Sequence, residues 1–214
     1  MLFIEHMLLG DEMGNITAYH GTKSCCVNGI LKENFSVKKP KKNDNHWLGH
    51  GVYFFEEYEL AYWWAKTKVL AHNRKYGESN YASVIEAEII YDRCVDLDTY
   101  NGRNNFFSFW QKYERKLVKE GIVLDFSMGE ADKQLVQQRK RCFALDCFKK
   151  EMGVDVLIYS FTKKDPAYER SKYNFKLADI FGLDFRERQI CVTMPENIMK
   201  RRDVTYNDYQ EVII

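Results

Sequence analysis

The sequence predicts a single α+β domain with a mostly antiparallel sheet flanked by helices. Its predicted elements follow the order β-α-β-α-β-α-α-β-β, which alternates too irregularly for a doubly wound parallel sheet. A chain of 214 residues is long enough to bury a core of its own without disulfide or metal staples. No internal repeat or linker divides it. We therefore expect one domain over residues 1–214, with a helical insertion at about 101–152.

Hydrophobic periodicity and turn residues give the individual elements. From Glu57 to about His72 the apolar residues recur at helical spacing, whereas from Ser83 to Ile90 they alternate with polar ones, as in a half-buried strand. Gly153 is expected to end the last long helix. In chain order, the expected strands are 16–20, 52–55, 83–90 with a continuation in pieces through 94–97, 154–161 and 189–193, and the expected helices are 24–31, 57–72, 104–119 and 130–152.

Composition and charge exclude several classes of protein. Hydrophobic residues make up 45% of the chain and charged residues 29%, which excludes a disordered, collagen-like or low-complexity chain. The formal net charge is only +1, so no overall field holds the protein to nucleic acid or membrane. Local basic runs remain at 38–42, 139–141 and 200–202.

The cysteines and the start of the chain predict a cytoplasmic protein. Six cysteines occur without a C-x-x-C pair or zinc-finger spacing, so we expect reduced, mostly buried thiols and no metal site. The apolar start is too short for a signal peptide and carries Glu5 and His6. No run approaches the about 18 apolar residues that span a membrane.

Two short segments carry residues suited to chemistry. His20 ends a predicted strand and is followed by Gly21, which allows a ligand to approach the backbone closely. Farther on, Gly49 and Gly51 precede a strand that contains Tyr53. Taken singly, the histidine is more often structural and the tyrosine is more often a core residue.

Together these segments resemble the ADP-ribosyltransferases of the diphtheria-toxin and poly(ADP-ribose) polymerase type. The resemblance rests on AYHGT, on WLGHGVYF with an Ala- and Trp-containing helix behind it, and on the late strand RQICV. It covers about residues 16–198, although the helices between 101 and 152 match nothing in that family. The resemblance implies a split β-sheet and a His-Tyr-Glu triad carried on three strands, in which Gln189 stands here for the glutamate.

The resemblance also implies a role for each matched residue. NAD is the expected co-substrate, cleaved between nicotinamide and ribose, and no metal is expected. His20, with Thr22 in the same turn, would hold the ribose hydroxyl, and Gly21 would hold the carboxamide through its backbone. Tyr53 and Trp64 would sandwich the nicotinamide ring, each contributing about 0.5–1.5 kcal/mol beyond burial. Because Trp63 and Trp64 diverge by about 100° on a helix, only one of them can face that pocket.

Three departures from the family pattern qualify the expected activity. A neutral Gln189 hydrogen-bonds the ribose more weakly than a carboxylate would, which predicts a rate about ten- to a hundredfold lower and single transfer rather than chain building. Ala61 stands where relatives carry a serine. Glu187 lies two residues before Gln189, on the same face of a strand, and could serve as the acceptor's base. The alternative is an exposed, salt-bridging Glu187.

The expected function is mono-ADP-ribosylation by an intracellular toxin or antiviral defence effector. Its partners would be NAD, an acceptor that is nucleic acid or protein, and an inhibitory antitoxin, with no membrane. A lysine of the 38–42 loop could contact the NAD pyrophosphate or a nucleic-acid acceptor. The alternatives are a catalytically weak module that only binds NAD or ADP-ribose and, less favoured, RNA 2′-phosphotransferase chemistry or a zinc or thiol enzyme.

Overall fold

The computed structural model describes residues 13–37, 46–127, 132–162, 180 and 186–205. The strands in these ranges are β1 (Gly14–Lys23), β2 (Val52–Phe55), β3 (Ala82–Tyr91), β4 (Cys94–Asp96), β5 (Val156–Thr162), β6 (Arg186–Val192) and β7 (Ile198–Asp203). The α-helices are α1 (Ser24–Glu33), α2 (Tyr58–Tyr76), α3 (Tyr100–Lys119) and α4 (Lys133–Met152), and a 3-10 helix, η2 (Pro195–Asn197), precedes β7. These elements confirm the predicted α+β class.

The sheet consists of two halves that meet at one residue pair. Its strand order is β4-β5-β6-β2-β1-β3-β7, and every neighbouring pair is antiparallel except β4–β5. β1 pairs with β3 along its whole length, from Gly14 to Lys23, but it pairs with β2 only through Tyr19 and Phe55. Along most of the boundary between β1 and β2, the facing edges of the two strands are therefore not paired with each other.

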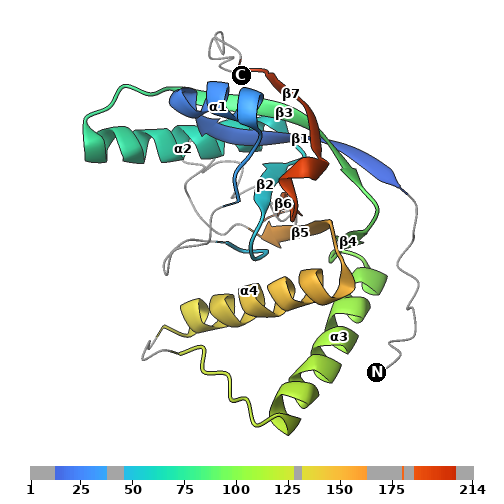
Figure 1. The fold of residues 1–214 in the computed structure, drawn as a ribbon. Helices are drawn as coiled ribbons and strands as arrows, with labels where there is room; N and C mark the ends of the chain where they lie inside the picture. The colour runs from blue at the N-terminus through green and yellow to red at the C-terminus, as the bar shows by residue number, and fades with distance from the viewer. Residues whose placement is uncertain (1–12, 38–45, 128–131, 163–179, 181–185, 206–214) are drawn as a thin grey trace.

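The helices cover both faces of this sheet (Figure 1). α1 packs on one face, where Val27 joins the largest core cluster together with Ile85, Ala87 and Ile89 of β3. α2 packs on the opposite face of β1 and β3. α4 covers the same face as α2 but over the β4-β5-β6 half, with α3 leaning against it. The face shared by α2 and α4 carries most of the predicted site residues.

The structure adds one strand that the sequence patterns missed. β7 contains the basic run 200–202. Lys200 Nζ lies 2.6 Å from Glu88 Oε2 and Arg202 Nε lies 2.6 Å from Glu86 Oε1, so the charged side chains pair across to β3. Such a strand escapes a search for hydrophobic alternation because ion pairs replace apolar contacts on one face.

Helix α3 begins four residues before the predicted start. The Thr99 hydroxyl caps it by accepting a hydrogen bond of 3.0 Å from the Gly102 backbone N–H. The cysteines are all free thiols, as expected, but the expectation that most are buried is wrong. Only Cys191 is buried, while Cys25 is exposed and the other four are intermediate.

Candidate functional site

His20 lies at the junction between the two halves of the sheet. Its Nδ1 is 2.8 Å from the backbone oxygen of Tyr53. Because a carbonyl oxygen only accepts hydrogen bonds, Nδ1 carries the proton and Nε2 of the neutral ring is left as an acceptor. Burial lowers the pKa of His20 and so favours this neutral form, although the bond to Tyr53 opposes the shift. The His20 ring packs edge to face against Phe35 and Phe54, with ring centroids 4.8 and 5.6 Å apart.

The ring of Tyr53 leaves the sheet on the other face. Tyr19 and Phe55 are paired and share a face, so His20 and Tyr53, one and two residues away from them, point to opposite sides. The Tyr53 hydroxyl donates to the Gly49 carbonyl oxygen at 2.6 Å and accepts from the Leu48 backbone N–H at 2.8 Å. Burial raises the pKa of Tyr53, which keeps the phenol protonated. The two residues therefore meet through the backbone of Tyr53 and not ring to ring.

Gln189 and Glu187 lie side by side on the face to which Tyr53 points. Gln189 Nε2 donates to Glu187 Oε1 at 2.5 Å. Glu187 is only 1% exposed, so the alternative of an exposed, salt-bridging glutamate is wrong. β6 begins at Arg186, three residues before the expected opening position of Gln189. The pair places an amide and a carboxylate together at the middle of the sheet.

Aromatic residues flank this pair along one row of the sheet. Phe55 and Tyr159 lie directly opposite Gln189 on its two neighbouring strands, and Tyr19 lies opposite Phe55. Because paired residues share a face, these four side chains form a continuous row across β1, β2, β6 and β5. Gln189 is thus the polar member of an otherwise aromatic row.

Trp64 joins the same face from helix α2. Its ring centroid lies 6.4 Å from that of Phe55, and Lys68 Nζ sits 4.3 Å from the Trp64 ring centroid. Trp63 is not part of the cluster that packs α2 against the sheet.

Gly21 is held tightly under α2. A Cβ at this position would meet the Ala61 carbonyl oxygen at 2.0 Å, so glycine is required for α2 to approach β1 this closely. Ala61 is itself fully buried. Thr22 follows on the face of His20 and is partly buried. Because β1 continues to Lys23 and pairs with β3 through His20, Gly21 and Thr22, the expectation that His20 ends a strand and opens a turn is wrong. The close packing of α2 against β1 is therefore enough to require glycine at position 21, whether or not Gly21 also binds a ligand.

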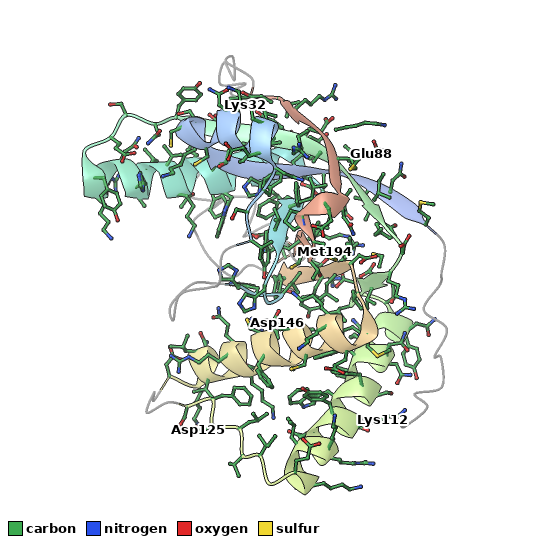
Figure 2. All side chains as sticks on the ribbon, in the orientation of Figure 1. Lys32, Glu88, Lys112, Asp125, Asp146 and Met194 are labelled. Atoms are coloured by element: carbon green, nitrogen blue, oxygen red, sulfur yellow. The ribbon has the colours of Figure 1, made fainter. Side chains whose placement is uncertain are left out.

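Helix α4 anchors the loop before Tyr53 through a buried lysine that the sequence patterns did not single out. Lys149 is 3% exposed, and its Nζ donates to the carbonyl oxygens of Leu48 and His50 and lies 3.1 Å from Asp146 Oδ1. Asp146 Oδ1 accepts from the His50 backbone N–H at 2.7 Å, and its Oδ2 contacts His50 Nδ1. A Cβ on Gly49, whose φ is 81°, would meet Asp146 Oδ1 at 2.2 Å. Figure 2 shows Asp146 on the edge of α4 that faces the sheet.

In the sequence, Asp146 and Lys149 lie in a predicted helix that matches nothing in the family, so no pattern marked them as site residues. A lysine and an aspartate three residues apart on a helix are most often an exposed pair. Only the tertiary structure shows that the pair supports the Gly49–Gly51 loop.

A second charged network lies on the opposite face of β6. Arg188 contacts three carboxylates: Glu56 at 2.6 Å, Asp98 at 2.7 Å and Asp96 at 2.8 Å. Ser160 Oγ also donates to Asp98 at 2.6 Å. Glu56 directly follows β2 and contributes to the network through its ion pair with Arg188. The network ties β2, β4, β5 and β6 together, so we regard it as structural.

Some expectations fall outside these observations. The 38–42 lysines lie outside the described residues. Within the described ranges, no group of three or more His, Cys, Asp or Glu side chains is arranged to hold a metal ion. No helix in those ranges has the length and apolar character needed to cross a membrane.

Comparison with known proteins identifies a relative. None of the known protein-family models matches the sequence. The chain is similar to the uncharacterized protein MJ0359 of Methanocaldococcus jannaschii, with 39% identity over 197 residues. The aligned region covers 86% of this chain and 85% of that protein. The chain therefore belongs to the same family as MJ0359.

Proposed function

We propose that the protein is an NAD-dependent mono-ADP-ribosyltransferase. The observation that carries the proposal is the hydrogen bond from His20 Nδ1 to the Tyr53 carbonyl oxygen, which joins the H-G-T and G-V-Y-F segments at the boundary between the sheet halves. It leaves a neutral Nε2 that can accept a hydrogen bond from a ribose hydroxyl. The side chains of Tyr53, Trp64 and Gln189 lie on the opposite face of the sheet, so the proposed site spans the boundary between β1 and β2.

The proposed reaction needs a group to hold the sugar and a group to take a proton. The bond from ribose C1′ to the nicotinamide nitrogen breaks, and its electron pair leaves with neutral nicotinamide. An oxygen or nitrogen of the acceptor donates an electron pair to C1′, and its proton passes to the Glu187 carboxylate. Gln189, at 2.5 Å from Glu187, would orient the ribose through its amide. Positioning and electrostatics supply most of the acceleration in such sites.

A specific observation favours the second candidate, a module that binds NAD or ADP-ribose without transfer. The position of the family's catalytic carboxylate is occupied by the neutral Gln189. A neutral hydrogen bond contributes about 0.5–1.5 kcal/mol, against about 1.5–3 for a charged one. The buried carboxylate of Glu187 beside it leads us to rank transfer above binding alone.

Nicotinamide release from NAD tests both candidates. We expect the wild-type chain to release nicotinamide, and His20→Ala and Tyr53→Ala to lose release while they keep the wild-type circular dichroism spectrum. His72→Ala, a histidine of α2, is the control and should retain release. Turnover in folded His20→Ala and Tyr53→Ala would overturn the proposal, whereas NAD-dependent thermal stabilisation without release would favour the binding module. Labelled NAD mixed with RNA, DNA or cell lysate would identify the acceptor fraction.

A further inference from the structure

Positive charge is concentrated on the two helices that have no counterpart in the family pattern. α3 and α4 together carry eleven Lys or Arg and three Asp or Glu, a net charge of 11 − 3 = +8. Because the whole chain has a net charge of +1, the rest carries 1 − 8 = −7. The near-neutral total therefore hides a strongly basic helical pair, which we call the α3–α4 arm (residues 100–119 and 133–152). A segregated charge of this kind creates a local field that attracts polyanions.

One face of α3 carries a continuous basic stripe. Lys112, Arg115, Lys116 and Lys119 follow the spacing i, i+3, i+4, i+7 and are all exposed. Figure 2 labels the first of these residues, Lys112, on α3. An ordinary solvated helix face interleaves acidic side chains at these spacings, because like charges at i and i+4 destabilise a helix. The stripe carries two such like-charged pairs, so a polyanionic partner accounts for it better than solvation does.

At its other side, the arm contributes to an aromatic cluster beside the proposed site. The Arg141 guanidinium of α4 lies 5.9 Å from the Trp47 ring and 5.6 Å from the Phe161 ring, and Arg141 Nε donates to the Trp47 carbonyl oxygen at 3.0 Å. The Trp47 and Phe161 rings meet edge to face at 4.4 Å. Phe161 is buried, so Trp47 and Arg141, which are partly exposed, are the members of the cluster that a base could reach. Rings and a guanidinium in contact suit the stacking of a nucleobase.

The aromatic cluster is next to the buried polar pair. Phe161 lies directly opposite Glu187 in the β5–β6 ladder, and Tyr159 lies directly opposite Gln189. Through Arg141, α4 therefore links the basic arm to rings that adjoin the residues proposed to act on the acceptor.

We propose that the α3–α4 arm binds a single-stranded nucleic acid and that its Trp47–Phe161–Arg141 cluster stacks a base of that strand beside Glu187 and Gln189. The acceptor in the proposed transfer is then a polynucleotide and not a protein. This role as acceptor rests on the proposed function, but the binding itself does not. A single strand fits better than a duplex because its bases are free to stack.

Fluorescence anisotropy with labelled single-stranded RNA and DNA, without NAD, tests the binding. In R115E/K116E/K119E we expect at least tenfold weaker binding. The matched control K66E/R74E/K75E reverses three exposed basic residues of α2, two of them in its last turn, and should bind as the wild type does. Both triples remove two basic residues from the last turn of a helix, so their effects on helix stability are comparable.

Two further measurements separate phosphate contacts from base contacts. In R115Q/K116Q/K119Q the slope of log affinity against log salt should become shallower by about 2, since each lost phosphate contact removes about 0.7. Trp47→Ala should weaken binding by about 5- to 150-fold with the slope unchanged, which is the effect of one lost stacked base. Comparison of the affinities for RNA and for DNA shows which polynucleotide the surface prefers.

The proposal would be overturned if R115E/K116E/K119E and K66E/R74E/K75E bound the single strand with equal affinity. It would also be overturned if the wild type bound a duplex as tightly as a single strand. Labelling of protein alone, with no polynucleotide bound, would also overturn it. His20→Ala should bind the strand as tightly as the wild type. Strand binding that persists in a chain without nicotinamide release would therefore refute the proposed function and the acceptor role, but not the binding surface.

Discussion

The imidazole of His20 is bonded to the backbone of Tyr53 and not to its side chain. Nδ1 lies 2.8 Å from the Tyr53 carbonyl oxygen, while the phenol points to the opposite face of the sheet and bonds the Gly49 carbonyl oxygen. The bond crosses the boundary where β1 and β2 share a single residue pair. His20 is therefore a connection between the two halves of the fold as well as a candidate binding group, and its protonation should affect stability.

The pH dependence of unfolding should report this connection. Unfolded histidine has a pKa of about 6.5, and burial lowers the pKa of His20 in the folded chain. Below about pH 6.5 the unfolded state binds more protons, so the free energy of unfolding should fall as the pH drops from 7 towards the folded pKa. Urea unfolding between pH 5 and 7.5 measures this.

His20→Asn provides the comparison, because its amide can still donate to the Tyr53 carbonyl oxygen without titrating. We expect the variant to lose part of the pH dependence and His72→Asn to keep it. An unchanged pH dependence in His20→Asn would mean that His20 does not titrate differently on folding.

Lys149→Met should destabilise the fold by about 3–5 kcal/mol. The buried ammonium group contacts the Asp146 carboxylate and two loop carbonyl oxygens, and its removal leaves a carboxylate without its cation. Lys150→Met, at the exposed neighbouring position, should change stability by less than about 0.5 kcal/mol. Chemical denaturation of both variants measures the difference, and similar values would show that the loop does not depend on Lys149.

Gly21→Ala should destabilise the fold by about 1–3 kcal/mol or more, because its methyl group would overlap the Ala61 carbonyl oxygen at 2.0 Å. Gly29→Ala is the matched control. It lies inside α1 with no atom within 4 Å of the new Cβ, so it should stabilise the helix by about 0.5–1 kcal/mol. If thermal unfolding shows both changes to be neutral, α2 can move away from β1 at little cost.

The double variant E187Q/Q189E should raise nicotinamide release by about ten- to a hundredfold. It keeps one amide and one carboxylate in contact, so a carboxylate is still present to take the acceptor's proton, but it moves the charge to the position proposed to bind the ribose. Gln189→Glu alone puts two carboxylates side by side, which raises the pKa of one of them, so it should gain less. Steady-state rates of the three proteins decide this, and a slower double variant would contradict the proposed role of position 189.

Local patterns in the sequence were sufficient for most elements of the fold. Alternation placed Ile85, Ala87 and Ile89 on one face of β3, and the spacing of two placed Glu187 and Gln189 on one face of β6. Both follow from the geometry of a strand, in which every second side chain points the same way. β7 was missed because its charged residues pair with Glu86 and Glu88 on β3, a contact that no local pattern contains.

By itself, then, the sequence determined the α+β class, the two segments around His20 and Tyr53, and the shared face of Glu187 and Gln189. The tertiary structure alone decided that His20 and Tyr53 point to opposite faces, that Glu187 is buried, and that Lys149 supports the loop before Tyr53. The reason is physical. The face of a side chain within one strand depends on its neighbours in the chain, whereas the partner it meets depends on how strands and helices distant in sequence pack together.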